Sequence, residues 1–424
     1  MAVGNMTGEW DQVANPGLLS ITNPHWLKFP PPSCAHHAVI AVIYTVIAIP
    51  GILGNFIMIL TFLTTSLRNH KNLMSVNLAI ADLLMNLEIP FLIKNSWDCG
   101  PKNFSATACQ VYGFTGGLSG TVAIASITGM AYQRYLKITR PFESNLLNTT
   151  NCSINVVATW IYALAFALFP IFYQGTSYTP EGYLTSCSFD YLTKDILTRI
   201  YIIVFGLSAY VLPMCLILFF YTRIGREVHQ ANRKLIAMHR LTPSHSAVST
   251  SDLKPSIPHQ TSRCLRRGSF SDSDLPELSR AVTRPASAAS RITTSSRQEQ
   301  LMFQSKMAME KKLVKSVILL IACWAIAWTP YAVVSLVGVF SSSSLISPLT
   351  SMLPALVAKC ASVVDPYIYF YSHPRYRLEA FLMMSRLSKW SQTKFDMIDI
   401  SFSVSRITSM IVREQPDRPS PSEP

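Results

Sequence analysis

Long apolar runs separated by short polar connections dominate the chain of 424 residues. Each of the seven longest runs is long enough for a helix that crosses a bilayer, which needs about 20 residues. None of them shows the apolar–polar alternation of a barrel strand, and backbone amides inside lipid must bond within their own segment. The pattern therefore predicts seven membrane-spanning helices, over residues 38–64, 73–97, 106–136, 154–173, 199–222, 313–340 and 346–371.

The composition supports this fold class and excludes others. Charged residues make up 14% of the chain and hydrophobic residues 49%, whereas about 25% of a typical soluble domain is charged. A set of soluble domains, a disordered chain and a coiled coil are therefore disfavoured. The nine cysteines show no CxxC pair and no zinc spacing, so we expect no metal site. We predict an all-α membrane protein with a seven-transmembrane helix bundle over residues 38–372.

The net charge of +13 does not indicate nucleic-acid binding, because the basic residues gather in alternate loops, as the positive-inside rule expects. The first connection contains Arg68 and Lys71, and the third contains Lys137 and Arg140. The first 37 residues contain a single basic residue. We therefore expect a multi-pass protein of the cell membrane with an extracellular amino-terminal tail over 1–37 and a cytoplasmic carboxyl terminus.

Two cytoplasmic segments differ from the spans in composition. Residues 229–305 are rich in Ser, Thr, Pro and Arg, and cannot bury enough apolar surface to offset their ordering entropy. They predict a disordered third cytoplasmic loop. Residues 373–388 interleave apolar and basic side chains, which predicts an amphipathic eighth helix on the inner membrane lipid surface, followed by a cytoplasmic tail over 389–424.

Three short motifs predict covalent modification. Asn5 and Asn103 begin glycosylation sequons on the expected outer side. Ser269 follows Arg266-Arg267-Gly268, the pattern that a basophilic kinase reads, and phosphate would add about −1.5 to −2 charges there. The alternative for Ser269 is a solvated linker in which Arg and Ser coincide by chance.

Motifs at matching places in the runs resemble those of one receptor family. Each motif alone is weak, but together they resemble the rhodopsin-like G protein-coupled receptors over residues 38–385. The motifs are Gly54-Asn55, Asp82 in LAIAD, Gln133-Arg134-Tyr135, Trp160, Pro213 with Tyr221, Trp328-Thr329-Pro330-Tyr331, and Asp365-Pro366-Tyr367-Ile368-Tyr369.

Within that family the chain resembles the opsins because of Lys359, seven residues before Pro366. The stretch 186–191 and His373-Pro374-Arg375 make the likeness closest to the opsins of invertebrates. An ionisable lysine in mid-helix costs about 2.5–3.5 kcal/mol on translocon scales and indicates a functional site. The opsin lysine at this place forms a Schiff base with retinal, so the resemblance implies covalently bound 11-cis-retinal. The alternative is a lysine that reaches the membrane interface or pairs structurally.

A protonated Schiff base needs a counter-ion. Many opsins of vertebrate visual type carry a glutamate three residues after the third-span cysteine, where this chain has Tyr112, and no Asp or Glu occurs over 106–136. The stretch 186–191 resembles the second extracellular loop of invertebrate visual opsins, which implies that Glu181 is the counter-ion. Glu88 in the second span is a rival, and Glu181 could instead be a solvated loop acid.

The resemblance also implies a disulfide bond between Cys109 and Cys187 that fixes the second extracellular loop over the bundle. Cys34 and Cys99 could pair with each other, although sequence alone does not decide pairing. Aromatic side chains would line a slot for the polyene of retinal, with ordinary helix packing as the alternative. They are Tyr112, Phe189, Tyr191, Tyr210, Trp328 and Tyr331.

The family resemblance assigns activation residues to the opposite end of the bundle. Asn55, Asp82 and Asp365 are polar groups inside spans and are costly unless they meet each other or water, so we expect them to form a cluster. The other residues that the resemblance implicates there are Tyr135, Tyr221, Pro366 and Tyr369.

Arg134 is the expected G protein contact, but its usual acidic neighbour is replaced by Gln133. Glu310, twenty residues before Pro330, would then hold the arginine from the sixth span alone. After the last span, His373-Pro374-Arg375 resembles an element of opsins that couple to Gq.

The sequence thus predicts a light-sensing receptor and no enzyme, with a heterotrimeric G protein of the Gq class, arrestin and a receptor kinase as partners by family resemblance. Two alternatives stay open at this point. A retinal photoisomerase would use the same lysine, and a receptor for a diffusible ligand would carry it by coincidence.

Overall fold

The structure is a computed structural model that describes residues 3–140, 143–173, 177–241 and 314–389. Six of the described helices are long and apolar enough to cross a membrane, and they match the first six predicted spans. The seventh span is α12 (Pro348–Ser372), with 25 residues. The chain is therefore a multi-pass membrane protein with the predicted helix bundle. Glu310, Ser269 and the tail from residue 390 lie outside the described residues.

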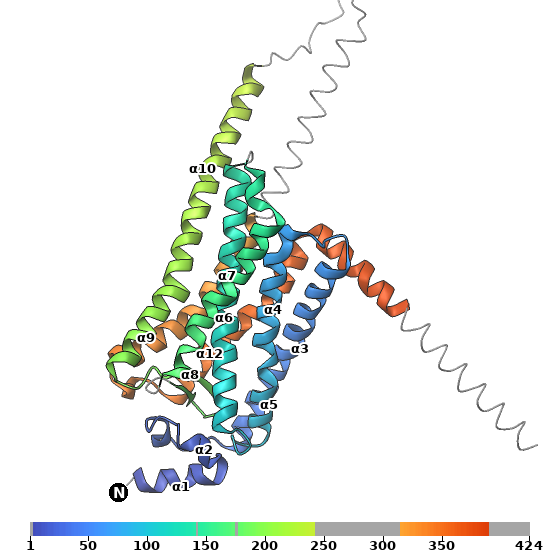
Figure 1. Cartoon of the computed structure of the whole chain (residues 1–424). Helices are drawn as coiled ribbons and strands as arrows, with labels where there is room; N and C mark the ends of the chain where they lie inside the picture. Colours follow the sequence, from blue (N-terminus) through green and yellow to red (C-terminus); the bar gives the residue numbers. More distant parts are fainter. Residues whose placement is uncertain (1–2, 141–142, 174–176, 242–313, 390–424) are drawn as a thin grey trace, which may run out of the picture. The chain divides into compact units, whose positions relative to one another are not determined.

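The first three spans and the last pack side by side (Figure 1). A second span that is broken at Pro90 packs against both the first and the third, and α12 packs along the first two. Proline lacks the N–H that would continue the helical hydrogen bonding, so the second span divides into two helices. These spans are α3 (Cys34–Thr64), α4 (Leu73–Leu87) with α5 (Ile89–Trp97), and α6 (Ala106–Thr139).

The fourth and fifth spans also carry interruptions near prolines. Pro170 lies at the start of the short α8, and a π-helical turn, η4, comes just before Pro213. A π turn absorbs the backbone mismatch that a missing N–H creates. The elements are α7 (Thr149–Ala167), α8 (Phe169–Phe172), α9 (Ile196–Gly206), η4 (Leu207–Val211), α10 (Leu212–Leu241), the helix Val314–Phe340, and a final helix over 374–389. Short 3-10 turns cover His70–Asn72, Ser144–Leu147 and Ser343–Leu345.

The helix α10 extends farther than the sequence pattern predicts. The disordered loop expected from residue 229 begins as helix, because α10 continues to Leu241. Polar residues such as Arg, Lys and Gln are good helix formers, and the first proline after Pro213 is Pro243. A polar composition therefore does not by itself end a helix.

A two-stranded hairpin adds a small sheet to the predicted all-α fold. Strands β1 (Tyr178–Glu181) and β2 (Ser186–Phe189) pair antiparallel, with Pro180 opposite Cys187. The turn between them contains Gly182, whose φ of 61° suits a residue without a Cβ. A disulfide bond between Cys109 and Cys187 joins the hairpin to α6, as predicted.

The amino-terminal residues form an ordered cap, which the sequence pattern did not predict. Its elements are α1 (Val3–Val13), α2 (Pro16–Leu19) and a 3-10 turn, Trp26–Lys28. Trp10, Leu18 and Trp26 are buried in one cluster. The Trp10 indole donates a hydrogen bond of 2.8 Å to the Phe29 carbonyl, and a second disulfide bond joins Cys34 to Cys99.

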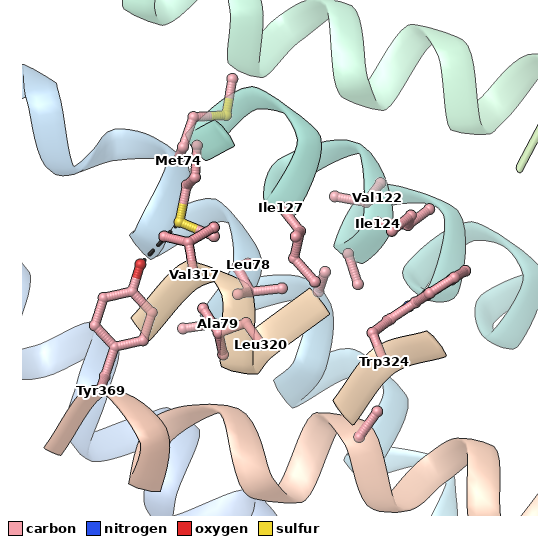
Figure 2. Packing of buried hydrophobic residues seen from close by; sticks show 14 of the residues in the cluster. Met74, Leu78, Ala79, Val122, Ile124, Ile127, Val317, Leu320, Trp324 and Tyr369 are labelled. Atoms are coloured by element: carbon pink, nitrogen blue, oxygen red, sulfur yellow. Dashed lines mark hydrogen bonds between the residues drawn. The ribbon is translucent and has the colours of Figure 1, made fainter. Parts of the chain in front are cut away.

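The helix α6 connects two ends of the bundle that differ in chemistry. We call them the hairpin end, at Cys109, and the Arg134 end. Between them lies an apolar core in which Met74, Leu78 and Ile127 pack closely (Figure 2). Figure 2 also shows the Tyr369 hydroxyl directed at a sulfur atom, that of Met130. Tight packing of this kind transmits a shift at one end to the other.

Candidate ligand-binding site

Lys359 lies in the middle of α12 and is 8% exposed. Its Nζ atom donates a hydrogen bond of 2.7 Å to Oε2 of Glu88. The same nitrogen lies 5.1 Å from the centre of the Tyr112 ring, within the range of a cation–π contact. A buried charge is tolerated only when it is paired, so Glu88 is the partner that allows Lys359 to occupy this position.

Glu88 reaches Lys359 because it stands at the junction of α4 and α5, two residues before Pro90. The residue is 3% exposed. Across from it, Gly116 of α6 leaves room for the carboxylate, since a Cβ at that glycine would lie 3.3 Å from Oε2. The helix break and the glycine together create the space for a buried acid.

Glu181 lies at the end of β1, where it is 4% exposed and therefore not a solvated loop acid. Its Oε2 atom accepts hydrogen bonds from Ser188 Oγ at 2.9 Å, the Tyr191 hydroxyl at 3.1 Å and Ser351 Oγ at 3.2 Å. Burial raises the pKa of the Glu181 carboxyl above its usual range, while the three donors and the charge of Lys359 partly offset that rise.

Lys359, Glu88 and Glu181 all line one cavity of about 330 Å³, a size typical of small-molecule sites. Five of the six predicted pocket aromatics lie in its wall. Tyr191 is not among the lining residues, but it contacts two of them, through its hydroxyl to Glu181 and through its ring to Tyr331. The five wall residues are Tyr112, Phe189, Tyr210, Trp328 and Tyr331.

The sequence analysis missed a stripe of glycines in the wall. Gly113, Gly116, Gly117 and Gly120 recur at helical spacing in α6, which places them on one face. A Cβ at Gly120 would lie 2.9 Å from the Trp328 ring, and one at Gly117 would lie 2.9 Å from Phe189. The glycines therefore let the aromatic rings approach the α6 backbone, and their spacing was a readable signal.

The Arg134 end holds the predicted polar residues. The side-chain amide of Asn55 donates to the Ser362 carbonyl at 2.8 Å, and the carboxyl groups of Asp82 and Asp365 contact each other. The Tyr369 hydroxyl and Ser75 Oγ are 2.7 Å apart. The two aspartates therefore meet as expected, whereas the described hydrogen bonds of Asn55 go to backbone carbonyls.

Arg134 lies within electrostatic reach of Tyr221, Tyr369 and His373. The His373 ring stacks on that of Tyr369 at 5.1 Å, and burial together with the nearby arginine lowers the pKa of His373 to about 4. The side-chain amide of Gln133 is directed at α7, where it donates to Cys152 Sγ. Tyr135 packs against Phe220 of α10.

Comparison with known proteins agrees with this arrangement. The model of the 7 transmembrane receptor (rhodopsin family) matches residues 54–369. Opsin-3 of Manduca sexta is 31% identical over 360 residues, which cover 85% of this chain and 80% of the relative. The Gq-coupled rhodopsin of Mizuhopecten yessoensis is 30% identical over 358 residues, which cover 83% of this chain and 60% of the relative. The crystal structure of squid rhodopsin is similar with a TM-score of 0.70 and 25% identity, over 90% of this chain and 93% of that one.

The matched range 54–369 contains both the cavity with Lys359 and the Arg134 end. A further relative, the blue-sensitive opsin of Apis mellifera, is 29% identical over 88% of this chain and 84% of its own length. The chain therefore belongs to the rhodopsin family of seven-transmembrane receptors and, within it, to the opsins, which are light-sensing G protein-coupled receptors and not enzymes.

Proposed function

We propose that this opsin holds 11-cis-retinal as a Schiff base on Lys359 and signals to a heterotrimeric G protein of the Gq class. The observation that carries the proposal is the place of the Lys359 amine inside an aromatic cavity of about 330 Å³. Among the described residues, no other lysine lines that cavity. Retinal, when bound, supplies absorption of visible light and a change from a bent to an extended shape.

The residues of the site fit an aldehyde with a long apolar chain. The amine of Lys359 supplies the nucleophile, which bonds to the aldehyde carbon while the carbonyl oxygen leaves as water. Apolar walls from Phe189, Tyr210 and Trp328 exclude water and so oppose hydrolysis of that bond. Glu88 and Glu181 supply negative charge for a protonated nitrogen.

The Val314–Phe340 helix places two stacked aromatic rings against the cavity. Trp328 lines the cavity and stacks on Trp324 at 5.7 Å, and Trp324 packs against Tyr210 at 5.5 Å. Pro330 follows two residues after Trp328, where a helix bends easily. A ligand that changes shape against Trp328 shifts the balance between two packings of the bundle.

At the Arg134 end, the proposed partner is the G protein, with arrestin and a receptor kinase proposed from family membership. The His373-Pro374-Arg375 element and the relative named as a Gq-coupled rhodopsin support the Gq class. Glu310 is proposed as the acid that restrains Arg134 in the dark. Ser269 remains a proposed phosphorylation site.

For orientation, we propose that the hairpin end faces the outside of the cell and the Arg134 end the cytoplasm. The connection between α3 and α4 contains Arg68 and Lys71, and the last turn of α6 and the residue after it contain Lys137 and Arg140. Basic residues at this end of the bundle support a cytoplasmic location. Asn103, at the hairpin end, is exposed and is proposed to be glycosylated together with Asn5.

The test is reconstitution of the full-length receptor with 11-cis-retinal, followed by an absorption spectrum in the dark. The Lys359→Ala receptor should form no visible pigment, whereas Lys94→Ala, which removes an exposed lysine of α5, should form it normally. A visible band in the Lys359→Ala receptor would refute the attachment site.

The photoisomerase alternative uses the same lysine and differs only in its output. The contacts around Arg134 and Tyr369 support signalling, because an enzyme that releases its product has no use for a G protein site. A receptor for a diffusible ligand would show no visible band at all.

A further inference from the structure

We propose that Glu88 is the acid that pairs directly with the protonated Schiff base, and that Glu181 acts on it only from a distance. The inference rests on the Schiff base at Lys359 proposed above. It differs from the expectation drawn from invertebrate opsins, which assigns the direct role to Glu181.

Glu88 is in direct contact with the nitrogen of Lys359. Glu88 Oε2 lies 2.7 Å from Lys359 Nζ, and the two side chains are 4% and 10% exposed. The nitrogen of the Schiff base is the Lys359 Nζ atom itself, so the bond to retinal leaves its neighbour in place. Forming the bond replaces two of the three ammonium hydrogens and keeps one N–H that can point at Glu88.

Glu181 is already hydrogen-bonded by groups other than Lys359. Its Oε2 atom already accepts from three hydroxyl groups, those of Ser188, Tyr191 and Ser351. In the part of the chain that the structure describes, it forms no ion pair with Lys359. Its charge still acts on Lys359 through space, but an interaction at a distance is weaker than one in contact.

Among the described residues, Lys359 is the one hydrogen-bond donor to the Glu88 carboxylate. Its Oε1 atom is buried and has no hydrogen-bond partner among the described residues. A buried carboxylate oxygen without a donor is costly, so the cation on Lys359 is the described partner that stabilises the ionised Glu88 carboxylate. Gly116 keeps the space around both oxygens open.

The remaining groups near the nitrogen do not compete with Glu88. The other titratable side chains in electrostatic contact with Lys359 are phenols, Tyr44 of α3 and Tyr112 of α6, and phenols are neutral at physiological pH. Tyr112 presents its ring face to the nitrogen, which favours a cation without adding a charge. Glu88 is thus the one acid in contact with Lys359 within the described residues.

The experiment compares Glu88→Gln, Glu88→Asp and Glu181→Gln receptors, each reconstituted with 11-cis-retinal and titrated from acid to alkaline pH. Because an opposite charge in contact raises the pKa of a cation, loss of Glu88 should lower the Schiff base pKa by about 1–3 units. The Glu88→Gln band should then move toward the near ultraviolet at a pH where the parent is still visible. Glu88→Asp should keep a visible band, and Glu181→Gln should shift the pKa by less than about 1 unit.

The opposite pattern, with the pKa lowered in Glu181→Gln and unchanged in Glu88→Gln, would overturn the proposal. An equal lowering of the Schiff base pKa in both variants would overturn the proposal that only Glu88 pairs directly with the nitrogen. Reduction of each sample with borohydride, which adds hydride to the C=N carbon and leaves a stable secondary amine, followed by peptide mass spectrometry, reports attachment regardless of protonation. Absence of the label on Lys359 in the parent would refute the proposed function instead.

A second readout needs no retinal. In the ligand-free receptor, Glu88→Gln and Lys359→Met should each lower the melting temperature, because each leaves a buried charge unpaired. The double variant should recover at least half of the loss. The pair of the exposed Lys94 and the partly buried Asp98 is the control, since Lys94→Met and Asp98→Asn should show little coupling. If the double variant lost as much in melting temperature as the two single variants together, the direct ion pair between Glu88 and Lys359 would be contradicted.

Discussion

The hairpin end and the Arg134 end of the bundle are held together by different forces. The hairpin end carries two disulfide bonds, Cys109–Cys187 and Cys34–Cys99, and a cap with two buried tryptophans. At the Arg134 end, the described cysteine Cys152 is free, and the contacts are hydrogen bonds such as Ser75 to Tyr369 and stacked rings such as Tyr369 on His373. One end is fixed by covalent bonds, and the other is fixed by contacts that can exchange.

This difference suits a receptor that keeps its ligand and changes its partner. A covalently attached ligand requires a cavity that persists, whereas coupling requires a surface with two arrangements of similar energy. The glycine face of α6 belongs to the first task and the Tyr369 contacts belong to the second. If so, changes at the hairpin end should alter stability, and changes at the Arg134 end should alter signalling.

The largest expected effect comes from the disulfide bond of the hairpin. Replacing Cys109 and Cys187 by alanine opens a loop with a sequence separation of 78, and should lower the free energy of unfolding by about 4 kcal/mol. Thermal denaturation in the dark and the yield of pigment both measure this. Cys215→Ala, at an exposed free cysteine, is the control. Unchanged stability without the Cys109–Cys187 bond would show that the hairpin end does not depend on it.

The next effect concerns the close approach of α6 and the hairpin. A Cβ at Gly113 would lie 2.3 Å from the Tyr178 ring, so Gly113→Ala should destabilise the receptor by about 1–3 kcal/mol through overpacking. Gly206→Ala is the matched control, because nothing lies within 4 Å of a Cβ there. Equal melting temperatures for both variants would mean that β1 moves away without cost.

At the Arg134 end, Tyr369→Phe should change signalling and leave the spectrum unchanged. The change removes the hydroxyl contact with Ser75, a hydrogen bond worth about 0.5–1.5 kcal/mol. We expect a rise in nucleotide exchange in the dark, measured on the same samples as the absorption maximum. Tyr371→Phe, at an exposed position, should change neither the dark nucleotide exchange nor the absorption maximum. A shifted spectrum in Tyr369→Phe would show that the two ends are not separate.

The smallest effect is expected from Gln133→Glu. The new acid would stand next to Arg134 at a half-buried position, where an ion pair contributes about 0–1 kcal/mol. Dark nucleotide exchange should fall by a factor of a few, and Glu310→Gln should raise it. If both variants match the parent, neither acid restrains Arg134.

The sequence was sufficient for the features that rest on local patterns. Apolar runs gave the spans, and Lys359 and the aromatic positions gave the cavity, because single residues inside a span are visible without knowledge of the fold. Glycine spacing in α6 was equally local and was overlooked. The cap was hidden because its apolar residues are scattered among polar ones and become buried only against the loops.

Other features depend on contacts that no local pattern contains. Glu88 and Lys359 are 271 positions apart, and only the break at Pro90 and the space at Gly116 bring them together. The sequence could therefore name two candidate acids without choosing between them. The hydrogen bond from the Tyr191 hydroxyl to Glu181, across ten positions of the chain, was likewise not predictable from a local pattern.

In the proposed function, light absorbed by retinal on Lys359 produces a signal at the Arg134 end. The most direct test is nucleotide exchange on a purified Gq heterotrimer by the receptor reconstituted with 11-cis-retinal, measured in the dark and after illumination, with retinal isomers extracted from the same sample. Illumination should convert the 11-cis isomer and raise nucleotide exchange, and Lys359→Ala should abolish both. Conversion of retinal by light with no rise in exchange on any heterotrimeric G protein would contradict the account and favour a photoisomerase.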